Sequence, residues 1–103
     1  MIDKIERNRN ELETLCRKYG VRQLDLFGSA TCPDEFDPSR SDLDFLVEFR
    51  QMEEMGPADQ YFGLLEELEE LFGGKIDLVS ASSMRNPYFI KSVNETRQVL
   101  YAS

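Results

Sequence analysis

The segment Ser41-Asp42-Leu43-Asp44-Phe45-Leu46-Val47 contains the most informative pattern of the chain, because apolar and polar side chains alternate along it. Such alternation predicts a strand, here over residues 42–49, with one face toward a core. Leu43, Phe45 and Val47 would lie on that buried face. The two aspartates would share the opposite face, roughly 7 Å apart along the strand. The segment therefore predicts a half-buried strand that begins with a pair of carboxylates.

On both sides of this strand, the chain alternates between helical and extended patterns. Apolar stripes and alternating runs predict helices over 2–19, 59–72 and 87–94 and strands over 21–27, 75–79 and 96–101. A segment rich in Pro, Asp and Ser predicts a loop over 30–41. This order indicates an α/β (α+β) fold in which helices pack mainly on one face of a sheet.

Helix boundaries follow from individual residues. Gly20 and the pair Gly73-Gly74 are expected to end the first two helices, since glycine suits the position after a helix. Asp59 is expected to cap the second helix, and Pro87 to open the third. Asn8 interrupts the apolar stripe of the first helix.

Length and charge restrict the classes of function. With 103 residues the chain predicts a single domain over 1–103, and its net charge of −8 argues against a surface that binds nucleic acid or anionic lipid directly. The sequence has no histidine, which excludes an imidazole base or ligand. Any metal would be held mainly by oxygen atoms, which favours a hard cation such as Mg²⁺.

The expected location is the cytoplasm. The beginning of the chain, Met1-Ile2-Asp3-Lys4-Ile5-Glu6, does not resemble a signal peptide, and no apolar run approaches the roughly 18 residues of a membrane span. Cys16 and Cys32 are interpreted as reduced, structural thiols.

The candidate chemistry lies in three aspartates. Asp42 and Asp44 share a strand face, and Asp77 on a later strand would bring a third carboxylate to them. Two like charges 4 Å apart repel by about 4 kcal/mol at an effective dielectric constant near 20. Bound Mg²⁺ would offset that repulsion, and two such ions can hold a triphosphate. Asp77 would act either as a third metal ligand or as the base that takes a hydroxyl proton.

A phosphate-binding turn is predicted directly after the first strand. Gly28 lets the backbone approach a phosphate closely, and Ser29 offers a hydroxyl. The N–H groups of the following turn would point at the anion.

Taken together, these motifs resemble those of the minimal nucleotidyltransferases, in the DNA polymerase beta-like superfamily. The resemblance is carried by Leu26-Phe27-Gly28-Ser29, by the segment 41–47 and by Ile76-Asp77-Leu78-Val79, and it extends over nearly the whole chain. It implies a mixed sheet of about four strands, with Mg²⁺ and ATP as cofactor and nucleotide donor. It also implies that Asp42, Asp44 and Asp77 hold the metal and that Gly28 and Ser29 hold the phosphates.

The resemblance further implies a partner. Many such small proteins resemble antitoxins that are encoded beside a HEPN-type RNase toxin and transfer AMP from ATP to a tyrosine of that toxin. Two alternatives remain open. The family pattern Gly-Ser-x-Ala-Arg-Gly is replaced here by Gly28-Ser29-Ala30-Thr31-Cys32-Pro33, which favours an antitoxin that neutralises its partner by binding alone. Transfer to a small molecule, such as an antibiotic hydroxyl, would need a further wall from a partner chain.

Overall fold

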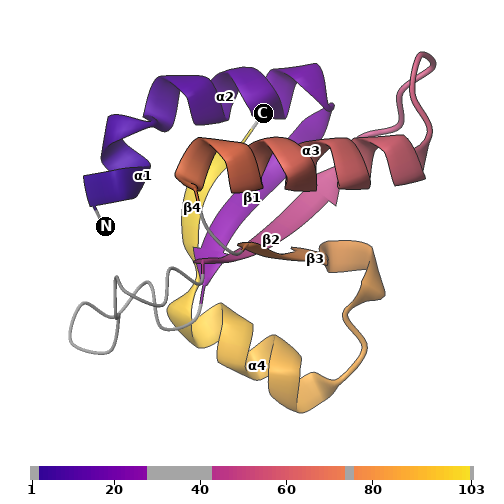
Figure 1. Ribbon diagram of the computed structural model, residues 1–103. Coiled ribbons are helices and arrows are strands. Elements are labelled where there is room, and N and C mark those ends of the chain that lie inside the picture. Colours follow the sequence, from indigo (N-terminus) through magenta and orange to yellow (C-terminus); the bar gives the residue numbers. More distant parts are fainter. Residues whose placement is uncertain (1–2, 28–42, 74–75, 103) are drawn as a thin grey trace.

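The computed structural model describes residues 3–27, 43–73 and 76–102, and within them the chain forms helices and four strands (Figure 1). The elements are α1 (Asp3–Arg7), α2 (Arg9–Lys18), β1 (Val21–Phe27), β2 (Leu43–Phe49), α3 (Pro57–Phe72), β3 (Ile76–Ser80), the 3₁₀ turn η2 (Ala81–Ser83), α4 (Pro87–Thr96) and β4 (Gln98–Ala102).

The strands form one mixed sheet in the order β3-β2-β1-β4. β1 runs antiparallel to both β2 and β4, whereas β2 and β3 are parallel. Parallel neighbours need a crossover connection, and α3 supplies it between β2 and β3. The prediction of a mixed sheet of about four strands is therefore confirmed.

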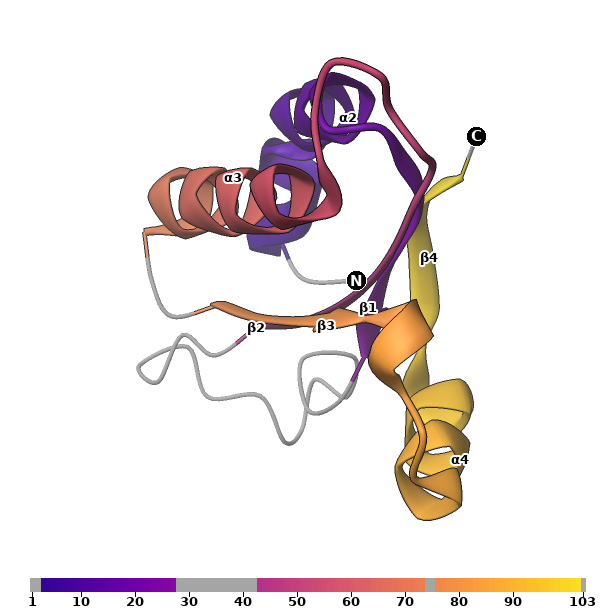
Figure 2. The ribbon, with the colours of Figure 1, turned by 90° about the vertical axis from the view of Figure 1, so that its right-hand side faces the viewer.

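The helices cover the two faces of the sheet unequally. α2 and α3 lie over one face, and α4 lies on the other side (Figure 2). The larger core cluster fills the space beneath α1, α2 and α3. Its strand residues include the apolar set predicted from alternation: Leu24, Leu26, Leu43, Phe45, Val47, Ile76 and Leu78. On the other face, Val93 of α4 packs with Phe27 and Leu46 in a smaller cluster. Packing mainly on one face is thus confirmed, with α4 as the exception.

Three helix predictions differ from the structure, and the simplest difference is that α4 ends at Thr96, two residues beyond the expected end at Asn94. The predicted helix over 2–19 is divided at Asn8, whose N–H donates to the Ile5 carbonyl at 3.2 Å in a tighter turn. α3 begins at Pro57 with Gly56 at the N-cap, two residues before the expected start at Asp59. The fixed φ of proline suits the first helical position, and Asp59 still lies in the first turn, where a negative charge is favourable.

The glycine stops are confirmed where the structure describes them. Gly20 and Gly73 adopt left-handed φ values of 66° and 63°, which glycine reaches without a steric penalty. Asn86 caps α4, since its side-chain oxygen accepts hydrogen bonds from the N–H groups of Tyr88 (2.9 Å) and Phe89 (3.4 Å).

Cys16 is a free thiol inside the larger core. Burial, and secondarily the nearby Glu13 carboxylate, raises the pKa of Cys16 to about 12, so the thiol stays protonated and unreactive. None of the helices in the described ranges combines the length and the apolar character that crossing a membrane requires.

Candidate functional site

Two of the three predicted aspartates stand side by side. Asp44 on β2 and Asp77 on β3 are paired positions of the parallel ladder. Their neighbours along the strands, Phe45 and Leu78, are buried under the helices, so both aspartates lie on the opposite face. Neighbouring strands lie about 4.8 Å apart, which places the two side chains next to each other.

The environment of this pair combines like charge with access to water. Asp44 is half-buried and Asp77 is exposed. Two carboxylates at adjacent positions repel one another, and solvent reduces that repulsion only partly where one of them is half-buried. A divalent cation between them would remove the repulsion, and carboxylate oxygens are the donors that Mg²⁺ prefers.

The other predicted site residues, Asp42, Gly28 and Ser29, lie outside the described residues. Within the described ranges, no three acidic or cysteine side chains gather closely enough to enclose a metal ion. The pair Asp44 and Asp77 fits a divalent cation because it supplies oxygen donors and negative charge, and Asp42 stays the predicted third ligand.

Aromatic side chains border the carboxylate face. Phe27 of β1 is the ladder partner of Asp44, so Phe27, Asp44 and Asp77 form one row across three strands. Phe89 of α4 meets the Phe27 ring edge to face, with ring centroids 5.9 Å apart. The neighbouring Tyr88 is 84% exposed. The first half of α4 thus packs beside the row that carries the two carboxylates.

A third carboxylate on this face has a different role. Asp25 of β1 is only 1% exposed, and the Arg97 guanidinium donates to its Oδ2 from Nε at 2.8 Å and also from Nη2. Gln23 Nε2 donates to both of its oxygens at 3.1 Å. Asp25 is thus neutralised inside the protein and is unsuited to hold an external cation.

Sequence reasoning missed this ion pair. The available signal was an acid between Leu24 and Leu26 in a strand with buried positions, because a buried acid is almost always paired. Arg97 lies 72 residues further along the chain, so no local pattern identified it as the partner.

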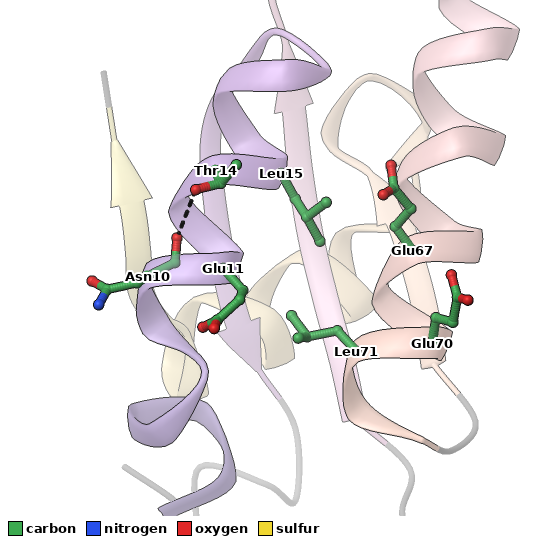
Figure 3. A pocket seen from close by; sticks show the side chains of 7 residues that line it. All are labelled: Asn10, Glu11, Thr14, Leu15, Glu67, Glu70 and Leu71. Atoms are coloured by element: carbon green, nitrogen blue, oxygen red, sulfur yellow. Dashed lines mark hydrogen bonds between the residues drawn. The ribbon is translucent and has the colours of Figure 1, made fainter.

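Two surface hollows lie away from the aspartates. One, of about 520 Å³, is a groove between α2 and α3 lined by Leu15, Leu71 and Glu70 among others (Figure 3). The other, of about 820 Å³, lies between the end of β2 and the beginning of α3. Neither is lined by Asp44 or Asp77. The catalytic hypothesis therefore depends on the paired carboxylates and not on a cavity.

Known proteins are similar to this chain in sequence. A "Putative protein adenylyltransferase" of Methanocaldococcus jannaschii is 36% identical over 87 residues, which are 84% of each chain. The protein adenylyltransferase MntA of Thermococcus cleftensis is 36% identical over 72 residues, covering 70% of this chain and 68% of that protein.

Solved structures agree with the fold. The structure of a "putative minimal nucleotidyltransferase" superposes with a TM-score of 0.72 at 26% identity, over 91% of this chain and 90% of that one. Two complexes also match. One is a toxin–antitoxin with AMP-PNP (TM-score 0.68, 20% identity, 93% of this chain and 74% of that one). The other is a tri-AMPylated Shewanella oneidensis HEPN toxin with its MNT antitoxin (TM-score 0.64, 20% identity, 95% and 72%).

The family model of the nucleotidyltransferase domain matches residues 9–100, from the beginning of α2 into β4. That range includes both paired aspartates, the whole of β1, β2 and β3, and the first part of β4. The chain therefore belongs to the nucleotidyltransferase domain family of enzymes.

Proposed function

We propose that the protein transfers AMP from ATP to a tyrosine hydroxyl of a HEPN-type toxin, in a Mg²⁺-dependent reaction that makes it the antitoxin of a toxin–antitoxin pair. The observation that carries this proposal is the side-by-side placement of Asp44 and Asp77 on neighbouring parallel strands. We take residues 1–103 as one nucleotidyltransferase domain and the cytoplasm, where ATP is available and thiols stay reduced, as its location.

The similar proteins support the donor and the acceptor class. Two relatives carry the name protein adenylyltransferase, and a structural neighbour was solved with the ATP analogue AMP-PNP. Another neighbour contains a HEPN toxin that bears three AMP groups. These proteins favour ATP over other donors and a toxin side chain over a small-molecule acceptor.

In this proposal, each site residue has a role set by its position. Asp44 and Asp77, together with Asp42, hold Mg²⁺, and Gly28 and Ser29 hold the phosphates of ATP. The metal supplies positive charge that stabilises the phosphates as negative charge develops. The tyrosine oxygen attacks the α-phosphorus, the bond to the bridging oxygen breaks, and pyrophosphate leaves. The exposed side chain of Asp77 is accessible to a second protein, either as metal ligand or as acceptor of the hydroxyl proton.

Intact mass spectrometry of a co-expressed partner tests the reaction. The chain would be produced with the protein encoded beside it, as wild type, Asp44→Asn and Asp77→Asn. Glu48→Gln is the matched control. It removes the same charge from β2, but at the opposite end of the strand from Asp44. Addition of AMP units by wild type and by the control, but by neither aspartate variant, is the expected result. Modification by all four proteins would contradict the assignment.

Neutralisation by binding alone is the second candidate, and the replaced Arg-Gly pair after Ser29 favours it. It predicts an unmodified partner that co-purifies equally with wild type and with both aspartate variants. Toxin activity that returns in Asp44→Asn while the complex persists would exclude it.

A further inference from the structure

The groove between α2 and α3 has an apolar floor and acidic sides. Leu15 of α2 and Leu71 of α3 point into the space between the helices (Figure 3). Glu11 lies beside them on α2, and Glu67 and Glu70 lie on α3. The volume of about 520 Å³ is sufficient for several side chains of another molecule.

The charges along this groove are not balanced within the described chain. Glu67 accepts from Lys18 Nζ at 3.1 Å and from the Tyr19 hydroxyl. Glu11 and Glu70 form no ion pair or hydrogen bond with any residue that the structure describes. Two carboxylates therefore flank an apolar floor without a cationic partner among the residues that the structure describes.

The end of α3 adds to the negative potential. A helix carries a partial negative charge at its C-terminus, where cations are favourable and acids are not. The last turn of α3 has no basic residue and contains Glu69 and Glu70. Glu70 lines the groove at that end, so the helix dipole and the carboxylates act in the same direction.

We propose that this groove receives a basic amphipathic helix of the protein partner, with an aliphatic side chain between Leu15 and Leu71 and lysine or arginine side chains against Glu11 and Glu70. A groove between two helices offers a third helix a place to pack, and apolar anchors between charged contacts are the usual form of such docking. The identity of the partner as the HEPN-type toxin rests on the proposed function.

The location of the groove separates binding from transfer. α2 and α3 cover the face of the sheet opposite to Asp44 and Asp77 (Figure 2). A helix bound between them leaves the carboxylate face open. The acceptor tyrosine then comes from a part of the partner that passes the sheet edge, or from a second partner molecule.

Charge reversal with a matched control tests the proposal. Glu11→Lys/Glu70→Lys changes the groove, and Glu53→Lys/Glu54→Lys makes the same charge change in the exposed segment before α3. Affinity for the purified toxin, measured by titration calorimetry at two salt concentrations, should fall at least about tenfold in the groove variant and less than about twofold in the control. The groove variant should also lose most of the salt dependence. AMP transfer at saturating toxin should stay at the wild-type rate.

The results separate the groove proposal from the proposed function. Equal affinity of both double variants for the toxin, with transfer intact, would overturn the groove proposal alone. A homodimer of the wild type that dissociates in the groove variant would also overturn it, since a second copy would then be the occupant. A wild-type chain that neither binds nor modifies the toxin would overturn both. If the lysine variant melts at a lower temperature than the wild type, Glu11→Gln/Glu70→Gln replaces it in the binding measurement and should also weaken binding.

Discussion

Polar side chains on the two faces of the sheet have different kinds of partner. Under α2 and α3, a polar side chain joins α3 to the ends of α2 and β2, since Gln60 Nε2 donates to the carbonyls of Tyr19 and Arg50, both at 2.9 Å. On the opposite face, one carboxylate (Asp25) is neutralised by Arg97, while Asp44 and Asp77 stand adjacent in like charge. Carboxylates on the same face of the sheet therefore need not belong to the same metal site. A buried carboxylate that is paired with an arginine stabilises the fold, whereas two adjacent carboxylates, one of them exposed, offer oxygen ligands to an external cation.

Replacing Asp77 should have the largest effect, because AMP transfer should be lost while the stability of the fold is kept. Asp77→Asn is expected to lower AMP transfer by at least about a hundredfold. The free energy of unfolding should change by less than about 0.5 kcal/mol, because Asp77 is exposed and the substitution relieves its repulsion with Asp44. Transfer assays and urea denaturation of the same preparation measure both quantities. Loss of stability in parallel with activity would place Asp77 with Asp25, as a structural residue.

Removing Arg97 should give the largest loss of stability. Arg97→Ala leaves the Asp25 carboxylate buried without its cation, at an expected cost of about 3 kcal/mol. Urea denaturation measures this value. Asp25→Asn/Arg97→Ala should recover part of the loss, since it removes the stranded charge. A double variant that is no more stable than Arg97→Ala would show that packing of the arginine stem, and not charge, matters.

On the helix-covered face, Gln60 offers the corresponding test without charge. Gln60→Leu has a similar volume but leaves the carbonyls of Tyr19 and Arg50 without their donor, at an expected cost of about 2 kcal/mol. Thermal unfolding followed by circular dichroism checks the value. A neutral result would mean that water replaces the amide at this junction.

Gly63 tests how tightly side chains pack on the helix-covered face, without a change in charge or hydrogen bonding. A Cβ at Gly63 would lie 2.5 Å from Cε1 of the Tyr19 ring, which the hydrogen bond to Glu67 holds in place. Gly63→Ala should therefore cost about 1 kcal/mol, despite the better helix propensity of alanine. The same substitution at Gly56, where no atom lies within 4 Å, is the control. If Gly63→Ala unfolds at a higher temperature than wild type, the ring moves freely.

The smallest effect concerns pH at the hydrogen bond between Tyr19 and Glu67. The Tyr19 hydroxyl, and after it the Lys18 ammonium, lowers the pKa of Glu67 below 4.5, and the same bond raises the pKa of Tyr19 above 10.0. The contribution of Glu67 to the free energy of unfolding is present above pH 4.5 and is lost as the pH falls through its lowered pKa. The contribution of Tyr19 is present below pH 10.0 and is lost as the pH rises through its raised pKa.

Tyr19→Phe should remove the alkaline loss and reduce the acidic one, because Lys18 still lowers the pKa of Glu67. Between these two pH ranges it should lower stability by about 0.5 kcal/mol. Unfolding free energies measured from pH 3 to pH 11 would show the difference between the two proteins disappearing at the acidic and alkaline ends. A difference that stays constant across this range would mean that the hydrogen bond does not depend on ionisation of Glu67.

Local patterns in the chain predicted most of its helices and strands. Alternation and helical spacing are local, so they identified the four strands, the helix of residues 59–72 to within two residues, and the face that carries Asp44. The sequence also identified the family, through short motifs at fixed spacing.

The order of the strands in the sheet and the pairing of charges, by contrast, follow from contacts between distant parts of the chain. The register that sets Asp44 beside Asp77 depends on the crossover through α3, and the Asp25–Arg97 pair joins positions 72 residues apart. The groove likewise lies between α2 and α3, two helices that are far apart in the sequence. Such contacts result from the packing of whole elements against one another, a physical constraint that no local pattern in the chain contains.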